Sequence, residues 1–120
     1  GAATMKLTAS TIQQLLIEEA AGLDPVRVTW ENYDLGQGRI TITCYGRAWT
    51  AAWFAMGQST IEQFFIFAGP DYILSNMVCN MAPGLKASKK HDEAYLTRII
   101  VAVQEALRRH TREQLHGISA

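Results

Sequence analysis

The sequence predicts an α+β fold: an N-terminal helix, a three-stranded antiparallel β-meander, and two or three C-terminal helices packed on the sheet. Apolar residues recur at helical spacing near both ends, whereas they alternate with polar residues between positions 26 and 54. Of the 120 residues, 48% are hydrophobic. This apolar fraction excludes a disordered chain and allows a core without metals or disulfides.

The first expected helix covers residues 10–21. Ser10 and Gln13 have the spacing of a capping box, and the apolar residues behind them recur at helical spacing. Gly22 suits the position after a helix, and Pro25 prevents its continuation. Residues 1–4 precede Met5 and look like a tag remnant, so we expect a single domain over residues 5–120.

Two alternating runs, 26–31 and 39–45, flank a turn with two glycines and predict an antiparallel hairpin. Residues 48–54 fit either a third strand or a helix that stacks Trp49 on Trp53. Their aromatic content and the short preceding turn favour the strand. The sheet then needs helices to cover one face.

Three helical segments are expected after the sheet. Ser59 and Glu62 have the spacing of a second capping box, ahead of a helix that Gly69 ends. Pro70 is suited to open the next helix. A polar loop over 83–90 leads to the longest helix, whose apolar stripe consists of Leu96, Ile99, Ile100, Val103 and Leu107.

Nothing in the sequence has the spacing of a catalytic or metal site. The motifs CxxC and HExxH are absent, and His110 and His116 are too far apart for paired ligands on one helix face. His91, Asp92 and Glu93 are more typical of a helix start than of a catalytic group. We therefore expect no enzyme activity, metal or cofactor. A deep pocket that contains His91 would support the enzyme hypothesis instead.

The compartment is inferred from what the sequence lacks. No apolar run reaches the roughly 18 residues of a membrane span, and no secretory signal is present. The two cysteines, Cys44 and Cys79, are expected to be free thiols. We therefore expect a cytoplasmic protein.

Six of the eleven aromatic residues fall within 25 positions of the sheet region. Tyr45, Trp49 and Trp53 are candidate partner-binding residues, because an exposed set would form a stacking platform or an interface anchor. The other interpretation places the tryptophans in the core, and burial energetics favour it.

The net charge of zero argues against holding nucleic acid by bulk electrostatics. This zero is the sum of a net charge of −3 over residues 1–85 and a net charge of +3 over residues 86–120. The basic candidates lie at the two ends of the last helix, about 30 Å apart, so one continuous stripe is not expected. They are Lys86, Lys89, Lys90, Arg108, Arg109 and Arg112.

The segment 36–53, which contains the string ITCYGRAW, resembles one found in small accessory proteins of enterobacterial phages and prophages. Met56-Gly57, residues 60–65 and residues 71–73 share the resemblance. It implies a phage origin in a bacterial host and carries no catalytic residues. It also implies an accessory role, for which inhibitors of host defence, including anti-CRISPR proteins, are prominent examples.

We therefore expect a non-enzymatic phage accessory protein that binds a host or phage protein, with inhibition of a host defence system as a specific hypothesis. The alternative is a nucleic-acid-binding accessory factor in phage replication or recombination, which uses the C-terminal basic residues and Trp49 or Trp53. A homodimer is left open, because the stripe of the last helix suits a core or a symmetric interface equally.

Overall fold

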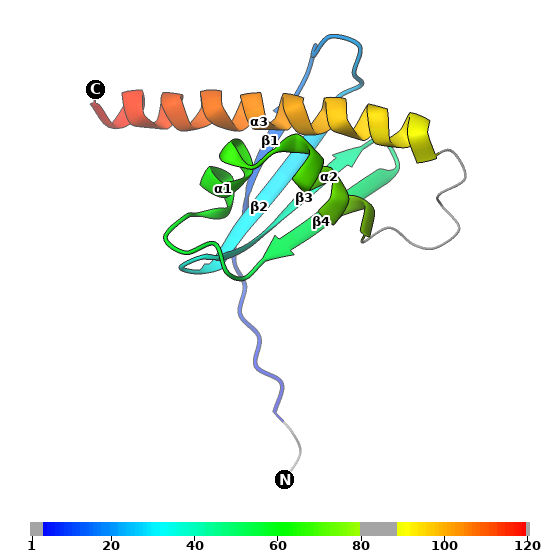
Figure 1. Cartoon of the computed structure of the whole chain (residues 1–120). Coiled ribbons are helices and arrows are strands. Elements are labelled where there is room, and N and C mark those ends of the chain that lie inside the picture. Colours follow the sequence, from blue (N-terminus) through cyan, green and yellow to red (C-terminus); the bar gives the residue numbers. More distant parts are fainter. Residues whose placement is uncertain (1–3, 80–88, 120) are drawn as a thin grey trace.

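The computed structural model describes residues 4–79 and 89–119. Within these ranges four strands come first: β1 (Gln13–Ile17), β2 (Val26–Asp34), β3 (Gln37–Cys44) and β4 (Arg47–Trp53). Three helices follow them: α1 (Ile61–Phe67), α2 (Pro70–Cys79) and α3 (Lys89–Ser119) (Figure 1). No helix of the described ranges is long and apolar enough to cross a membrane.

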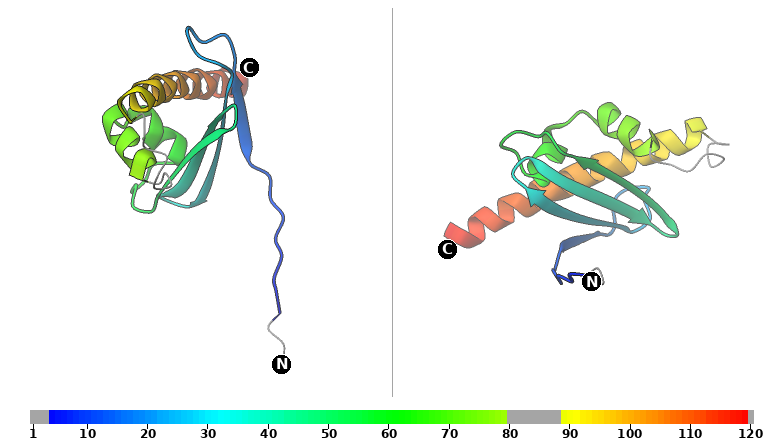
Figure 2. Two further views of the ribbon diagram at one scale, coloured as in Figure 1. Left: turned by 90° about the vertical axis from the view of Figure 1, so that its right-hand side faces the viewer. Right: turned by 90° about the horizontal axis from the view of Figure 1, so that it is seen from below.

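The strands form one antiparallel sheet in the order β1-β2-β3-β4, so each strand pairs with its neighbour in sequence. All three helices lie on the same side of this sheet (Figure 2, left). The alternation in sequence decides which side is covered, because successive strand residues point to opposite faces. The apolar half of each alternating run faces the helices, and the polar half faces away.

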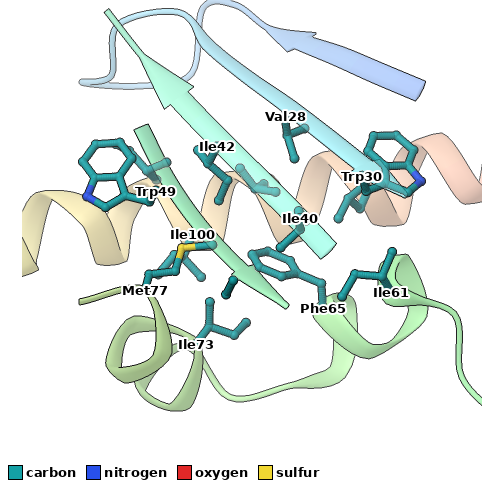
Figure 3. Packing of buried hydrophobic residues seen from close by; sticks show 14 of the residues in the cluster. Val28, Trp30, Ile40, Ile42, Trp49, Ile61, Phe65, Ile73, Met77 and Ile100 are labelled. Atoms are coloured by element: carbon teal, nitrogen blue, oxygen red, sulfur yellow. The ribbon is translucent and has the colours of Figure 1, made fainter. Parts of the chain in front are cut away.

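The core fills the space between the sheet and the helices (Figure 3). β2 contributes Val26, Val28 and Trp30, and β3 contributes Ile40, Ile42 and Cys44. Helices α1 and α2 add Ile61, Phe65, Ile73 and Met77. The stripe expected on the last helix is buried in full, from Leu96 to Leu107 on α3.

Helix α1 approaches the sheet very closely at Gly38 on β3. A Cβ atom placed there would lie 2.8 Å from the Glu31 carbonyl oxygen and 2.8 Å from the Ile61 Cβ. Only a residue without a side chain therefore allows the start of α1 to pack against this part of β3. This contact fixes the height of α1 above the sheet.

The end of α1 is held by Gln104 of α3. The Gln104 side chain is buried, and its Nε2 donates to the carbonyl oxygens of Phe65 and Ala68 at 3.0 and 2.7 Å. The last carbonyls of a helix have no partner within the helix. Gln104 supplies that partner and joins α1 to α3.

The predicted N-terminal helix over 10–21 is wrong, and so is the number of three strands. Residues 13–17 instead form β1, the strand that the prediction lacks. Leu15 and Ile17 lie opposite Val28 and Val26, and their half-buried side chains continue the apolar face of β2. Ile12 and Leu16, which have helical spacing, are exposed on the other side. Pairing with β2 has overridden a local helical pattern.

The hairpin of β2 and β3 is confirmed, and residues 47–53 form a strand rather than a helix. The helices after the sheet are confirmed as well. The capping box of α1 is shifted by one residue: Thr60 accepts from the Gln63 amide, and Gln63 Oε1 accepts from the Thr60 amide. Most of the expected loop 83–90 lies outside the described residues.

Replacing Gln104 by leucine should lower the free energy of unfolding by about 2 kcal/mol, because a buried and a partly buried carbonyl oxygen lose their donor. Urea unfolding measures the change. Gln114→Leu is the matched control, since Gln114 is an exposed glutamine of the same helix. Equal stability of the two variants would contradict a capping role for Gln104.

Candidate functional site

The face of the sheet that no helix covers is the candidate binding surface. It is made of the polar half of the alternating runs, and threonine and alanine form its centre. Most of these side chains are exposed or half-buried. They are Arg27, Thr29, Glu31 and Tyr33 of β2, Arg39, Thr41 and Thr43 of β3, and Ala48, Thr50 and Ala52 of β4, followed by Phe54.

Two aromatic rings stack at one end of this face. Tyr33 and Phe54 have ring centroids 6.1 Å apart and planes inclined by 14°. Tyr33 is 46% exposed and Phe54 is 60% exposed. A stacked pair of this kind is a rigid apolar surface that costs little conformational entropy to bury against a partner.

Arg39 holds the pair in place from the neighbouring strand. Its Nε donates to the Tyr33 hydroxyl at 2.8 Å, and one terminal nitrogen donates to Thr50 Oγ1 at 3.2 Å. The Tyr33 hydroxyl in turn donates to Glu31 at 3.3 Å. The ring of Tyr33 is therefore oriented by charged groups on both sides. We call Tyr33, Phe54 and Arg39 the aromatic patch.

Trp49 and Trp53, two of the predicted partner-binding residues, lie in the core. They are only 3% and 9% exposed. Trp53 packs on Phe64 and donates its indole N–H to the Tyr72 hydroxyl at 3.0 Å, while Arg47 lies over the Trp49 ring. Their strand positions share the covered face, so neither ring is available as an exposed platform in this fold.

Tyr45 is exposed, but it lies at the opposite end of the sheet from the aromatic patch. Its hydroxyl donates to Asp24, and so does the hydroxyl of Tyr95 of α3. The contact of Tyr95 with the buried Cys44 sulfur, together with burial and the Asp24 carboxylate, raises the pKa of Tyr95 to about 12. The contacts of Tyr95 with Cys44 and Asp24 tie α3 to this end of the sheet.

Of the basic candidates, the structure describes the side chains of Arg108, Arg109 and Arg112. Arg108 and Arg109 both bind the carboxylate of Glu105, at 2.6 and 3.1 Å, and Arg112 is exposed further along α3. The two arginines lower the pKa of Glu105, so this carboxylate offsets part of their charge. Lys86 lies outside the described residues, as do the side chains of Lys89 and Lys90.

Two of the residues considered for catalysis, Asp92 and His110, have structural partners. Asp92 forms an ion pair with Arg47, and the His110 ring packs edge-on against Trp30. The His91 side chain lies outside the described part. Among described residues, no three side chains of the metal-binding types gather at one point.

Glu62, at the start of α1, joins the helix to β2 at the same end of the sheet as the aromatic patch. Its carboxylate accepts from the Trp30 indole N–H at 3.2 Å and from the Asn32 amide at 2.9 Å. Asn32 also accepts from the Ile61 amide at 2.8 Å. Burial raises the pKa of Glu62, but the donors, Asn32 first among them, outweigh it and leave that pKa below the usual 4.5.

A lowered pKa means that the folded state favours the ionised Glu62. Its contribution to stability is therefore complete above pH 4.5 and is lost as the pH falls through the folded-state pKa. We expect Glu62→Gln to reduce the loss of unfolding free energy between pH 7 and about pH 3. The control is Glu18→Gln, at an exposed glutamate. Identical pH slopes in wild type and Glu62→Gln would contradict this role.

The aromatic patch was not among the residues predicted to bind a partner. Tyr33 shares its strand face with Thr29 and Glu31, and this alternation was the available signal. It separates Tyr33 from Trp30, but it does not say which face the helices cover. The same alternation separates Phe54, the residue after β4, from Trp53, the last residue of that strand.

Comparison with known proteins gives one family. A model of a phage family, phiTE_072, matches residues 5–82, which include the whole sheet, α1 and α2. No curated protein and no solved structure matches the chain. The phage part of the resemblance seen in the sequence is thereby confirmed, whereas an enterobacterial source stays a prediction. Since the match covers more than half of the 120 residues, the chain belongs to this phage family.

Proposed function

We propose that this phage protein is a non-enzymatic accessory protein that acts by binding another protein through the aromatic patch. The observation that carries the proposal is the stacked, exposed pair of Tyr33 and Phe54 beside Arg39. Tyrosine and arginine are enriched among the residues that dominate binding energy at interfaces. The flat threonine and alanine floor next to them offers space for the partner.

The partner is a host or phage protein, and the class that we propose is a component of a host defence system. Inhibitors of such systems are prominent examples among phage accessory proteins, the class that the sequence resembles. The patch contains one arginine, and Glu31 is close to it. A partner with an apolar anchor and a nearby carboxylate for Arg39 would complement this chemistry.

The experiment compares capture of host proteins by the wild-type protein and by the double variant Tyr33→Ala, Phe54→Ala. We expect the double variant to lose at least about 30-fold in affinity for the captured partner, as removal of an interface anchor does. Calorimetry with the purified partner measures the two dissociation constants. Retained affinity in the double variant would contradict the proposal.

Phe67→Ala is the matched control. Phe67 ends α1, is 85% exposed and lies on the helical side of the molecule. Its removal takes away a similar apolar area from a different surface, so we expect affinity to be unchanged. A loss equal to that of the double variant would place the interface elsewhere.

The alternative function is binding of single-stranded nucleic acid on the same face. The observation in its favour is that Arg39 adjoins an exposed aromatic pair on a four-stranded sheet, with Arg27 further along the same face. Bases stack on aromatic rings while cationic side chains contact phosphates. Salt-dependent binding of oligonucleotides that the double variant abolishes would support this alternative over a protein partner.

A further inference from the structure

Residues 4–12, which we call the arm, extend away from the sheet ahead of β1 (Figures 1 and 2). Every residue of the arm is exposed, and Met5 and Leu7 are each 83% exposed. Apolar side chains at alternate positions are typical of a strand that packs on one face. The arm therefore has the pattern of a strand, and the described chain provides no neighbour for Met5 and Leu7.

The groove between β1 and α3 lies at the edge of the same sheet. β1 is an edge strand, so its outer backbone groups pair with no other strand of the described chain. The groove has a volume of about 460 Å³ and an apolar floor that includes Leu15, Ile17, Ala102 and Ala106. Its rim carries several carboxylates, among them Glu18 and Glu113, together with Arg109 and His110.

We propose that the arm of a second copy of this chain pairs antiparallel with β1 and packs Met5 and Leu7 along the apolar floor of this groove. The exchange is reciprocal, because each copy has one arm and one groove. An interface that uses the same segment twice closes on itself as a two-fold dimer. The proposal concerns the sheet edge and is independent of the aromatic patch.

The apolar pattern selects one register. Directly opposed residues of antiparallel strands share a face. Leu15 and Ile17 lie on the covered face, opposite Val28 and Val26 of β2. If Leu7 lies opposite Leu15 of the other copy, Met5 lies opposite Ile17. Thr11 then lies opposite Thr11 of the other copy, on the two-fold axis.

Charge is compatible with the same register. Lys6 is the only charged residue between positions 4 and 17, so two such segments can pair without opposed charges. In this register Lys6 lies opposite Leu16 of the other copy, and Glu18 is its diagonal neighbour on the same face. Lys6 and Glu18 thus lie side by side on the open face, where their opposite charges favour this register. A long edge strand with so few charges has little to prevent pairing.

The first test is a symmetric disulfide. Thr11→Cys, in a Cys79→Ser background, should form a covalent dimer on mild oxidation, because directly opposed residues have Cα separations within the range of a disulfide. Cys44 is buried and does not compete. Ser10→Cys is the matched control, since its symmetry mate lies two residues along the partner strand, beyond that range. Equal cross-linking at both positions, or none at position 11, would overturn the register.

The second test measures mass in solution by light scattering after size exclusion. The full chain should have twice the 13.3 kDa of one copy. Leu7→Glu should raise the dimer dissociation constant at least about 100-fold, because two carboxylates enter apolar, acidic-rimmed grooves. Leu7 has no packing role within its own copy, so circular dichroism should be unchanged. Leu35→Glu, at the exposed leucine of the β2–β3 turn, should leave the dimer intact.

A monomeric wild-type protein at all concentrations would overturn the proposal. So would a dimer that Leu7→Glu leaves unchanged, because its interface would then lie on another surface. If Leu7→Glu and Leu35→Glu both dissociate the dimer, the effect is a general one of added charge. That result would also contradict an interface formed by the arm.

Discussion

The structure depends on one constraint: the apolar face of a four-stranded sheet must be removed from water. The alternation in β2, β3 and β4 puts Val28, Ile42 and Trp49 on one side, and burial of such side chains contributes about 2 kcal/mol each. The helices are placed by this requirement, with the stripe of α3 as the main cover. Because all of them lie on one side, the threonine-rich face is left open. The candidate surface is thus a consequence of how the core is built.

Polar contacts then fix where the cover lies, and those at the start of α1 lie near the aromatic patch. Asn32 and Glu62 join the start of α1 to β2, and the Met56 amide donates to the Gly36 carbonyl in the β2–β3 turn at 2.9 Å. Tyr33 and Phe54 stand next to these residues in sequence, on the other face. The end of the sheet that carries the patch is therefore braced by α1. A braced aromatic pair loses little freedom on binding, which favours a rigid interface.

The sequence predicted those elements whose local pattern agrees with their tertiary role. The hairpin of β2 and β3 and the stripe of α3 are of this kind, because alternation and helical spacing coincide with burial. The helix predicted over residues 10–21 is wrong because the capping-box spacing of Ser10 and Gln13 is a local signal, whereas the pairing of Leu15 with Val28 is a long-range contact. The prediction that the tryptophans form the binding site was wrong for a related reason. Trp49 and Tyr33 lie on opposite faces of the sheet, and only the position of the helices shows which of the two is exposed.

The two proposed interactions are geometrically compatible. Opposed residues of antiparallel strands share a face, so pairing two copies through their arms and β1 strands continues the sheet with both open faces on the same side. Gln13 lies opposite Trp30, at the end of β2 that carries Tyr33, so a two-fold axis through Thr11 would place the two aromatic patches on one continuous surface, one on each side of the axis. A partner with two copies of its own binding segment would engage both patches, and the second contact would form at a high effective concentration. Edge pairing would in this way convert a small patch of modest affinity into a bivalent one.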